Sequence, residues 1–500
     1  MKILNPLFFI IVAILTSCGG AEIQPNVEIE GAAVSKPNQI KPHIVFILLD
    51  DLGVDAGPCS NDLSLMTNLE FRCGRSLVFE NAYAYPSCTP SRAALMTGRA
   101  SFRHGANDVQ LNSTKLQLSE TTIPEAIKLL GSDYTSAAFG KWHLADNDNG
   151  GVDSPNLQGF DHYEGNPRQT GTYVYPAGKY EWFVNGHSAG LSGKYKTTQI
   201  ADSAINYFLE NHDNGPLYSH IAFVNPHLPF HLPPMDLHSY NLPDPSTVLP
   251  ANVNSTHKRQ PLVDPYYFAM LEAADNEINR LVDEFTIASN RPILFIVMGD
   301  NGSAQQVTQI DTNGVYRTKS STYQGGIRVP LMMWSSDNSR FSVDAGSYGE
   351  NVIINDLFPT LVDIMTDKKP PESDGVSLRS VIENNSLSLK RPYIYVEGGH
   401  LRRQPFEYTA IREDGLKLTL SEADRGPRRY RDNFIELYDI TSDKTEMSDI
   451  STDCKHVSDV DEIFEYIVSF RKSQDEISGG DKFNEPFYRQ IISELKESCE

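Results

Sequence analysis

The chain has 500 residues, of which 40% are hydrophobic and 10% aromatic, and it carries a formal net charge of −22. This length and apolar content predict more than one folded domain and exclude a generally disordered protein. The acidic balance excludes nonspecific nucleic-acid binding, which depends on basic surfaces, and a polyanionic ligand would need a local basic patch.

The first residues form a targeting segment. Lys2 precedes the apolar run 7–15, which is too short to span a bilayer comfortably. Leu15-Thr16-Ser17-Cys18 then resembles a bacterial lipobox, so we expect residues 1–18 to be a lipoprotein signal peptide and Cys18 to be lipidated. An ordinary signal peptide that is cut nearby is the alternative. Residues 19–41 are polar with scattered Pro and Gly, which predicts a flexible tether. The protein is therefore expected to be exported to the periplasm or cell surface, with the lipid as its only membrane attachment.

Apolar runs alternate with amphipathic segments in the next part of the chain. The runs predict strands buried on both faces of a sheet, and polar residues follow each of them, at 43–49, 134–139, 217–224 and 293–298. Hydrophobic residues at helical spacing predict helices at 265–285 and 355–365. This alternation predicts a layered α/β domain with active-site groups at the carboxyl ends of strands.

The Lys- and Pro-rich segment 367–373 predicts a domain boundary, which divides a catalytic domain at 42–368 from a C-terminal α+β subdomain at 369–500. Beyond it, short strands are predicted at 393–396, 408–412 and 416–420, and a final helix at 485–496. These elements predict a small antiparallel sheet with a helix.

The segment 86–99 carries the most specific motif. It contains Cys88-Thr89-Pro90-Ser91-Arg92 followed by Thr97-Gly98-Arg99. This pattern closely resembles the signature of type I sulfatases, which belong to the alkaline phosphatase superfamily. The resemblance implies that a separate maturation enzyme oxidises Cys88 to formylglycine, whose hydrate attacks the sulfur of a sulfate ester. It also implies an α/β fold with a large mixed sheet between helices and a smaller C-terminal antiparallel sheet with a helix.

Two acidic strand ends resemble the halves of the family's metal site. Asp50-Asp51 follows the first predicted strand, and Asp300-Asn301 follows the run 293–298. Oxygen ligands of this kind suit one hard divalent cation, with Ca²⁺ expected before Mg²⁺ or Mn²⁺. Taken alone, Asp50-Asp51 would also be explained by a helix N-cap after a strand.

Four further polar residues lie in segments that resemble other motifs of the family. Lys141 and His143 stand in Gly-Lys-Trp-His, His227 follows Asn-Pro, and Lys319 precedes a Gly-Gly-x-Arg-x-Pro element. The resemblance implies that Lys141, Lys319 and His227 contact the sulfate. His227 would protonate the leaving alcohol, His143 would accept the proton that releases sulfate, and Arg92 would hold an oxygen of the modified residue.

The chain departs from the family pattern at Gln324, where a Glu is usual. We expect this change to alter the electrostatics near Lys319 without abolishing activity. His231 follows His227 closely, and the sequence leaves open whether it reaches the site.

Lipidation of Cys18 and conversion of Cys88 would leave four cysteines. Export to an oxidising compartment favours disulfides between the sequence-local pairs, with four buried thiols as the alternative. The pairs are Cys59 with Cys73 and Cys454 with Cys499.

Basic residues are dense near the C-terminal strands, where Arg428 and Arg429 stand in the run 425–431 after Arg402, Arg403 and Arg412. One hypothesis is that Arg428 and Arg429 bind further sulfates or carboxylates of a polysaccharide, and an exposed solvated loop is the alternative. The predicted function is removal of sulfate from a sulfated polysaccharide or oligosaccharide. A phosphonate or phosphate ester hydrolase of the same superfamily and a non-catalytic glycan-binding relative remain alternatives.

Overall fold

The computed structural model describes residues 40–59, 65–107, 115–167, 178–250, 252–253, 259–309, 317–398, 406–422, 434–473 and 483–500. All of them belong to one compact unit, Ala33–Glu500. Within these ranges, none of the helices combines the length and the apolar character that a membrane span needs. The predicted signal peptide, its Cys18 and the run 425–431 lie outside the described residues.

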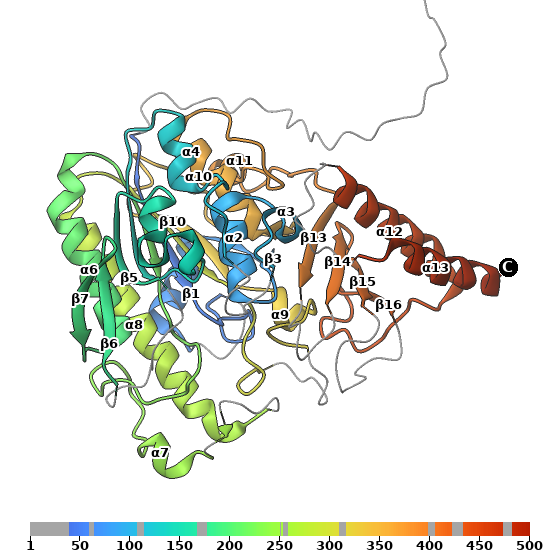
Figure 1. Ribbon diagram of the computed structural model, residues 1–500, viewed down its shortest axis with the longest axis horizontal. Coiled ribbons are helices and arrows are strands. Elements are labelled where there is room, and N and C mark those ends of the chain that lie inside the picture. The colour runs from blue at the N-terminus through green and yellow to red at the C-terminus, as the bar shows by residue number, and fades with distance from the viewer. Residues whose placement is uncertain are drawn as a thin grey trace, which may run out of the picture. The chain divides into compact units, whose positions relative to one another are not determined.

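A mixed ten-stranded sheet forms the centre of this unit (Figure 1). Its central strands β10, β9, β1, β8, β4 and β5 run side by side, and β10 is antiparallel to its neighbour β9 while the other five are parallel. Across the sheet the order is β11 (Gly346–Tyr348), β2 (Leu77–Phe79), β10 (Leu331–Ser335), β9 (Ile293–Gly299), β1 (His43–Leu49), β8 (Leu217–Ala222), β4 (Thr135–Lys141), β5 (His162–Asn166), β6 (Tyr180–Val184) and β7 (His187–Ser192).

The sheet is covered on both faces, which explains why strands such as β1 and β9 are almost entirely apolar. Along β1, Ile44, Phe46 and Leu48 enter one hydrophobic cluster, whereas Val45 and Ile47 enter the other. Because successive side chains of a strand point to opposite faces, a strand between two cores has no position for a solvated residue.

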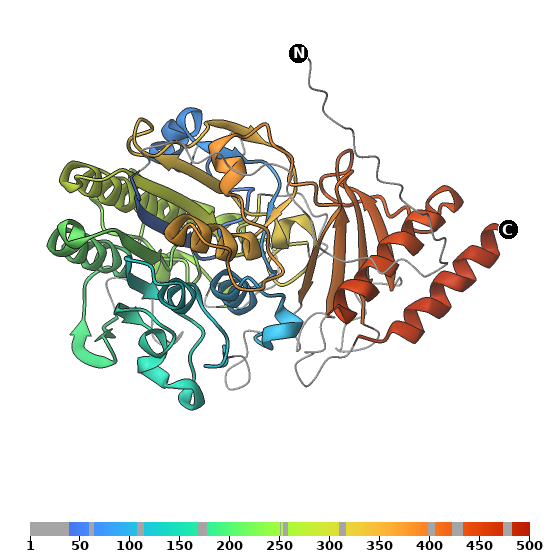
Figure 2. The same ribbon diagram turned by 90° about the horizontal axis from the view of Figure 1, so that it is seen from above.

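Helices supply the outer layers (Figures 1 and 2). One face is covered by α2 (Cys88–Thr97), α4 (Ile123–Leu129), α10 (Leu357–Thr366) and α11 (Arg379–Glu383). The other face is covered by α1 (Thr67–Arg72), α6 (Lys196–Asn211) and α8 (Asp264–Ala288). The remaining short elements are α3 (Ser101–His104), α5 (Ser154–Leu157), α7 (Pro245–Val248), α9 (Gln324–Ile327) and the small sheet of β3 (Ala82–Tyr83) and β12 (Val352–Ile353).

A separate antiparallel sheet follows near the C-terminus, formed by β13 (Tyr393–Gly398), β14 (Glu407–Arg412), β15 (Leu416–Ser421) and β16 (Ile435–Asp439). Helix α12 (Val457–Lys472) packs on β14 and β15, and α13 (Glu485–Cys499) packs on α12. The predicted fold class, a large mixed sheet with helices plus a small antiparallel sheet, is therefore confirmed. Leu378 and Val381, which follow the predicted boundary at 368, pack in the core of the large sheet.

Both predicted disulfides are present. Cys59 is bonded to Cys73 and Cys454 to Cys499, while Cys88 is the free, buried cysteine of the described residues. The first bridge closes a loop beside α1, and the second ties the end of α13 to the residues before α12.

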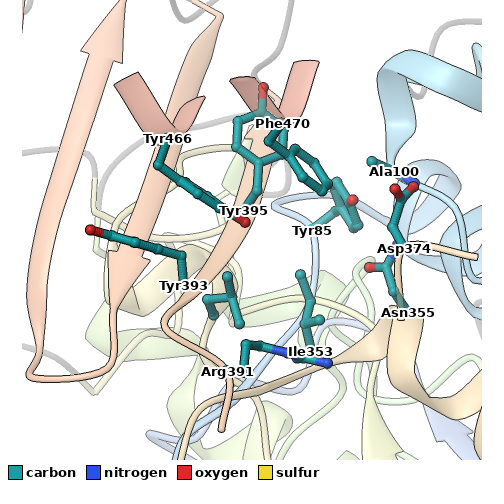
Figure 3. A pocket seen from close by; sticks show the side chains of 11 residues that line it. Tyr85, Ala100, Ile353, Asn355, Asp374, Arg391, Tyr393, Tyr395, Tyr466 and Phe470 are labelled. Carbon is teal, nitrogen blue, oxygen red and sulfur yellow. The ribbon is translucent and has the colours of Figure 1, made fainter. Parts of the chain in front are cut away.

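A cavity lies where β13 and α12 meet the large-sheet part of the chain (Figure 3). Tyr393, Tyr395 and Tyr466 line it from the C-terminal side, and Tyr85 and Asn355 from the other. None of the predicted catalytic residues lines it.

Candidate functional site

The predicted site residues follow strands that are neighbours in the large sheet. In the order β9, β1, β8 and β4, the strands lead into Asp300, Asp50, Asn225 and Lys141. Backbone hydrogen bonds hold the strand ends in line, because Asp300 donates to the Leu49 carbonyl at 2.9 Å and Asp50 to the Asn225 carbonyl at 3.1 Å. Residues far apart in the chain thus meet at one edge of the sheet, as the alternating pattern predicted.

Cys88 begins helix α2 and is 1% exposed. Its Sγ lies 3.2 Å from Asp50 Oδ1, 3.8 Å from Asp51 Oδ1 and 3.5 Å from Lys319 Nζ. The N-terminal end of this ten-residue helix carries a partial positive charge, which favours an anion beside residue 88.

Each buried carboxylate at the sheet edge has a cationic partner. Lys141 Nζ donates to Asp50 Oδ2 at 2.5 Å, and Lys319 Nζ donates to Asp51 Oδ1. The guanidinium of Arg92 donates to Asp300 Oδ2 through Nε at 3.0 Å and Nη2 at 2.8 Å.

A third hydrogen bond of Arg92, from Nη1, reaches the Lys141 carbonyl at 2.9 Å. Arg92 therefore joins Asp300 to the strand end that carries Lys141, and its Nη2 also lies 3.9 Å from Asp50 Oδ1.

Burial and charge shift the ionisation of these groups. Burial raises the pKa of Asp50, but the charges of Lys141, His227, Arg92 and Lys319 together outweigh burial and hold that pKa well below its usual value. Burial, with Asp50, raises the pKa of Asp300 to about 6 against the opposing effect of Arg92. Burial and the Asp300 and Asp50 carboxylates raise the pKa of the Cys88 thiol well above its usual value, so the unmodified residue is a poor thiolate nucleophile.

The residues present fit a hard divalent cation. Asp51 Oδ2 and Asn301 Oδ1 are buried oxygen atoms with no hydrogen-bond partner among the described residues. Ligand atoms of Asp50, Asp51, Cys88 and His227 all lie within 4.8 Å of one another. Unpaired buried oxygens are costly unless something binds them, and carboxylate and amide oxygens are the ligands that Ca²⁺ and Mg²⁺ prefer.

His227 faces this cluster with one defined ring nitrogen. Nδ1 lies 2.5 Å from the Leu228 carbonyl oxygen, which can only accept a hydrogen bond, so Nδ1 carries a hydrogen. Nε2 lies 3.7 Å from Asp51 Oδ2 and is the ring nitrogen that faces the carboxylates. Burial lowers the pKa of His227, while Asp51 opposes that effect, and an anion bound nearby would raise the pKa.

His143 lies on the opposite flank, after β4. Burial, then Lys141 and Arg92, lower the pKa of His143 well below its usual value, so its ring is neutral at pH 7. Its buried Nδ1 has no hydrogen-bond partner in the part of the chain that the structure describes. A neutral imidazole with an available nitrogen suits a proton acceptor.

Three site residues other than glycine have left-handed backbone conformations: Asp51 at φ 65°, His143 at φ 62° and Ser320, next to Lys319, at φ 76°. Such conformations cost free energy, and surrounding contacts maintain them. Their gathering at one place is typical of a functional site.

Two residues that the sequence left open have structural partners. The His231 ring nitrogens contact the Pro229 carbonyl at 2.8 Å and the Tyr195 hydroxyl at 3.3 Å, which accounts for this buried imidazole without a role in the site. Gln324 is buried, and its Oε1 accepts from the Tyr83 hydroxyl at 3.5 Å.

Sequence reasoning missed the residues behind the Lys319 loop, namely Glu407, Lys417 and Glu446, which are buried against it. The predicted substrate-binding residues Arg428 and Arg429 lie outside the described residues. Arg412, which is described, pairs with the acidic residues Asp414, Asp459 and Glu462.

Comparisons with known proteins agree with this geometry. Residues 42–367 match the family model described as Sulfatase. Arylsulfatase G of Rattus norvegicus is 25% identical over 415 residues, which cover 72% of this chain and 72% of that protein. The solved structure of Ps i-CgsB in complex with k-i-k-neocarrahexaose has a TM-score of 0.68 at 19% identity and covers 92% of this chain and 99% of its own. That of BT4656 in complex with its substrate D-glucosamine-2-N,6-O-disulfate has a TM-score of 0.67 at 20% identity and covers 88% and 100%.

Proposed function

The chain belongs to the sulfatase family, and from that premise we propose that it removes sulfate from a sulfated polysaccharide or oligosaccharide by means of formylglycine at position 88. Sulfatase activity follows from the family and its relatives. The substrate class is supported by the two solved relatives, one of which binds a neocarrahexaose and the other a disulfated glucosamine.

The observation that carries the proposal is the placement of Cys88. It begins α2 and lies beside Asp50, Asp51 and Lys319 with its thiol protonated. A formylglycine there would supply a hydrated aldehyde, with one hydroxyl to attack sulfur and a second to allow release of sulfate. A divalent ion held by Asp50, Asp51, Asp300 and Asn301, with Ca²⁺ expected first, would supply positive charge to the nucleophile and the sulfate oxygens.

The surrounding side chains would handle charge and protons. Lys141 and Lys319, both buried or nearly so, would hold sulfate oxygens and neutralise the anion. His227 Nε2 would give a proton to the departing alcohol oxygen, and His143 would accept the proton whose removal expels sulfate. The net reaction consumes one water and yields an alcohol, a sulfate ion and a proton.

The decisive test is peptide mass spectrometry of residue 88 after coexpression with a formylglycine-generating enzyme, followed by assays on defined sulfated oligosaccharides. We expect the aldehyde at position 88 and loss of sulfate from at least one glycan. C88A should be inactive, and C88S, which has one hydroxyl, should release at most one equivalent of alcohol and no free sulfate, because the sulfate stays on the serine as an ester. An intact thiol in active protein would refute the mechanism.

Parallel assays with an aryl sulfate, a phosphate diester and a phosphonate ester address the alternative within the superfamily. A sulfatase should prefer the sulfate ester, and a phosphonate preference would contradict the substrate class.

The Arg428 and Arg429 hypothesis is tested by comparing two substrates. R428A/R429A should slow hydrolysis of a polymer and spare the aryl sulfate, whereas equal losses on both substrates would count against it.

The apolar run 7–15 and the lipobox at Cys18 support export as a lipid-anchored protein of the periplasm or cell surface. C18A should move the protein from the membrane fraction to the soluble fraction. Retention of that variant in the membrane would contradict the anchor.

A further inference from the structure

The loop that carries Lys319 is fixed on the site side by backbone hydrogen bonds. Lys319 N–H donates to the Ser303 carbonyl at 3.1 Å, and Ser320 N–H donates to the Pro86 carbonyl at 2.7 Å. These bonds join the loop to the chain after Asn301 and to the chain before Cys88. The position of Lys319 Nζ therefore depends on how well this loop is held.

On its other side the loop is held by the C-terminal sheet. Glu407 Oε2, from β14, accepts hydrogen bonds from Thr322 N–H at 2.6 Å and from Thr322 Oγ1 at 2.7 Å. Lys417 Nζ, from β15, donates to the Thr322 carbonyl at 2.5 Å. Thr409 Oγ1 donates to Thr322 Oγ1 at 2.7 Å. Both backbone polar groups of Thr322 are thus bound by charged side chains of another sheet.

An ion pair completes this contact. Lys417 Nζ also donates to Glu446 Oε1, and the other oxygen of Glu446 accepts from Gln324 N–H at 2.6 Å. The two side chains are 0% and 1% exposed. One buried pair therefore binds the loop at Thr322 and at Gln324.

The two faces of β15 show why this is unusual. Leu416, Leu418 and Leu420 pack in the core with α12, while Lys417 and Thr419 form the alternate face. Such alternation normally places the polar face in water, yet Lys417 and Thr419 are buried. An apolar pair of similar volume is often as stable as a buried ion pair, but here it would deprive the Thr322 carbonyl and the Gln324 N–H of these hydrogen bonds and could not orient them. The retained charges therefore indicate a positioning role.

We propose that the buried Lys417–Glu446 pair, with Glu407, makes the C-terminal sheet a positioning element that sets the placement of Lys319 against residue 88. The inference rests on the proposed contact of Lys319 with sulfate. Glu407, Lys417 and Glu446 are positioning residues, because each of them binds the loop that carries Lys319.

The test compares K417M/E446Q with a matched control, R471M/E397Q. Arg471 and Glu397 form another buried pair of the C-terminal part, 3% and 1% exposed, which contacts Tyr395 and Ser101. The readouts are kcat and KM on an aryl sulfate, the affinity for inorganic sulfate by calorimetry, and Tm.

We expect both variants to lower Tm by similar amounts. K417M/E446Q should lower kcat about 10- to 100-fold, since displacing a catalytic group by an ångström costs on that order, and should weaken sulfate binding about 10-fold. The control should stay within about twofold in kcat, and K417R, which keeps the charge and the donors, should recover most of the loss. Unchanged kcat in K417M/E446Q, or equal kcat losses in both variants, would overturn the inference.

A second variant and a binding measurement cover two further cases, a variant that does not fold and a protein that hydrolyses no ester. If K417M/E446Q does not fold, E407Q keeps the size of the side chain but weakens the acceptor that holds the N–H and Oγ1 of Thr322, and an unchanged kcat in E407Q overturns the inference. Sulfate binding requires no turnover. A wild-type protein that binds sulfate and hydrolyses no ester would refute the proposed function, while the binding comparison would still decide the positioning inference.

Discussion

Replacement of Arg92 by methionine should destabilise the protein through a buried charge. Arg92 is 2% exposed, and its Nε and Nη2 both donate to Asp300 Oδ2, at 3.0 and 2.8 Å. Opposite charges about 4 Å apart attract by ~4 kcal/mol at an effective dielectric constant of about 20. Loss of one partner of a buried pair typically costs ~3–5 kcal/mol. We therefore expect R92M to lower the free energy of unfolding by about 4 kcal/mol.

The reasoning is checked by a double-mutant cycle in urea with a chelator present, so that metal binding does not contribute. R92M/D300N removes both charges. The free energy of unfolding that it loses should be about 3 kcal/mol smaller than the sum of the losses in R92M and D300N. R103M, which breaks the buried pair between Arg103 and Asp374 away from the site, should cost a similar stability and retain turnover. If the stability losses of R92M and D300N add up to the loss of R92M/D300N within about 0.5 kcal/mol, the coupling between the two residues is refuted.

Three further predictions concern separate parts of the chain. C454S/C499S opens a loop with a sequence separation of 45 and should lower the free energy of unfolding by about 4 kcal/mol. A loss of less than about 1 kcal/mol would contradict this. Burial raises the pKa of Asp275 from 3.8 to about 6, so wild-type stability relative to D275N should fall by about 3 kcal/mol as pH rises from below 4 to 7, and a pH-independent difference would contradict this. H227N should lower kcat by ~10²–10⁴-fold at constant Tm, whereas H231N should lower Tm and largely spare kcat.

The central sheet could be predicted because its strands leave little ambiguity. A run such as 44–49 is apolar at every position, and the structure buries all of it between two cores. Polar residues that follow such runs must gather at one edge when the strands are parallel neighbours. Asp50, Lys141 and Asp300 could therefore be placed together before any contact was known.

Other elements carried signals that the sequence analysis did not use. The hairpin of β6 and β7 turns at Asn185-Gly186, a dipeptide typical of tight hairpin turns, but its strands lie at the sheet edge, and β7 is largely exposed. Helix α12 buries Val460, Ile463 and Ile467 at helical spacing, which the charged residues between them obscure.

The residues behind Lys319 could not be found from the sequence. The pattern of β15, Leu-Lys-Leu-Thr-Leu-Ser, predicts one solvated face, and the partner of Lys417 is Glu446, on a segment beyond β16. Only tertiary packing shows that this polar face meets a loop about 95 residues earlier, at Thr322. Local patterns predict which face is polar, but they do not predict what covers it.

A divalent ion bound among the charges of the site would explain how a protein with a net charge of −22 can attract an anion. Each carboxylate pairs with one cation, Asp50 with Lys141 and Asp51 with Lys319, and the pair of Asp300 with Arg92 completes the set. The formal charges of these groups cancel, so the buried cluster as it stands neither attracts nor repels an anion strongly. A divalent ion among the same oxygens would compete with the lysines for Asp50 and Asp51 and would leave the site positive. The lysines would then be available to the sulfate oxygens, so the same two residues would stabilise the site without the ion and bind the substrate with it.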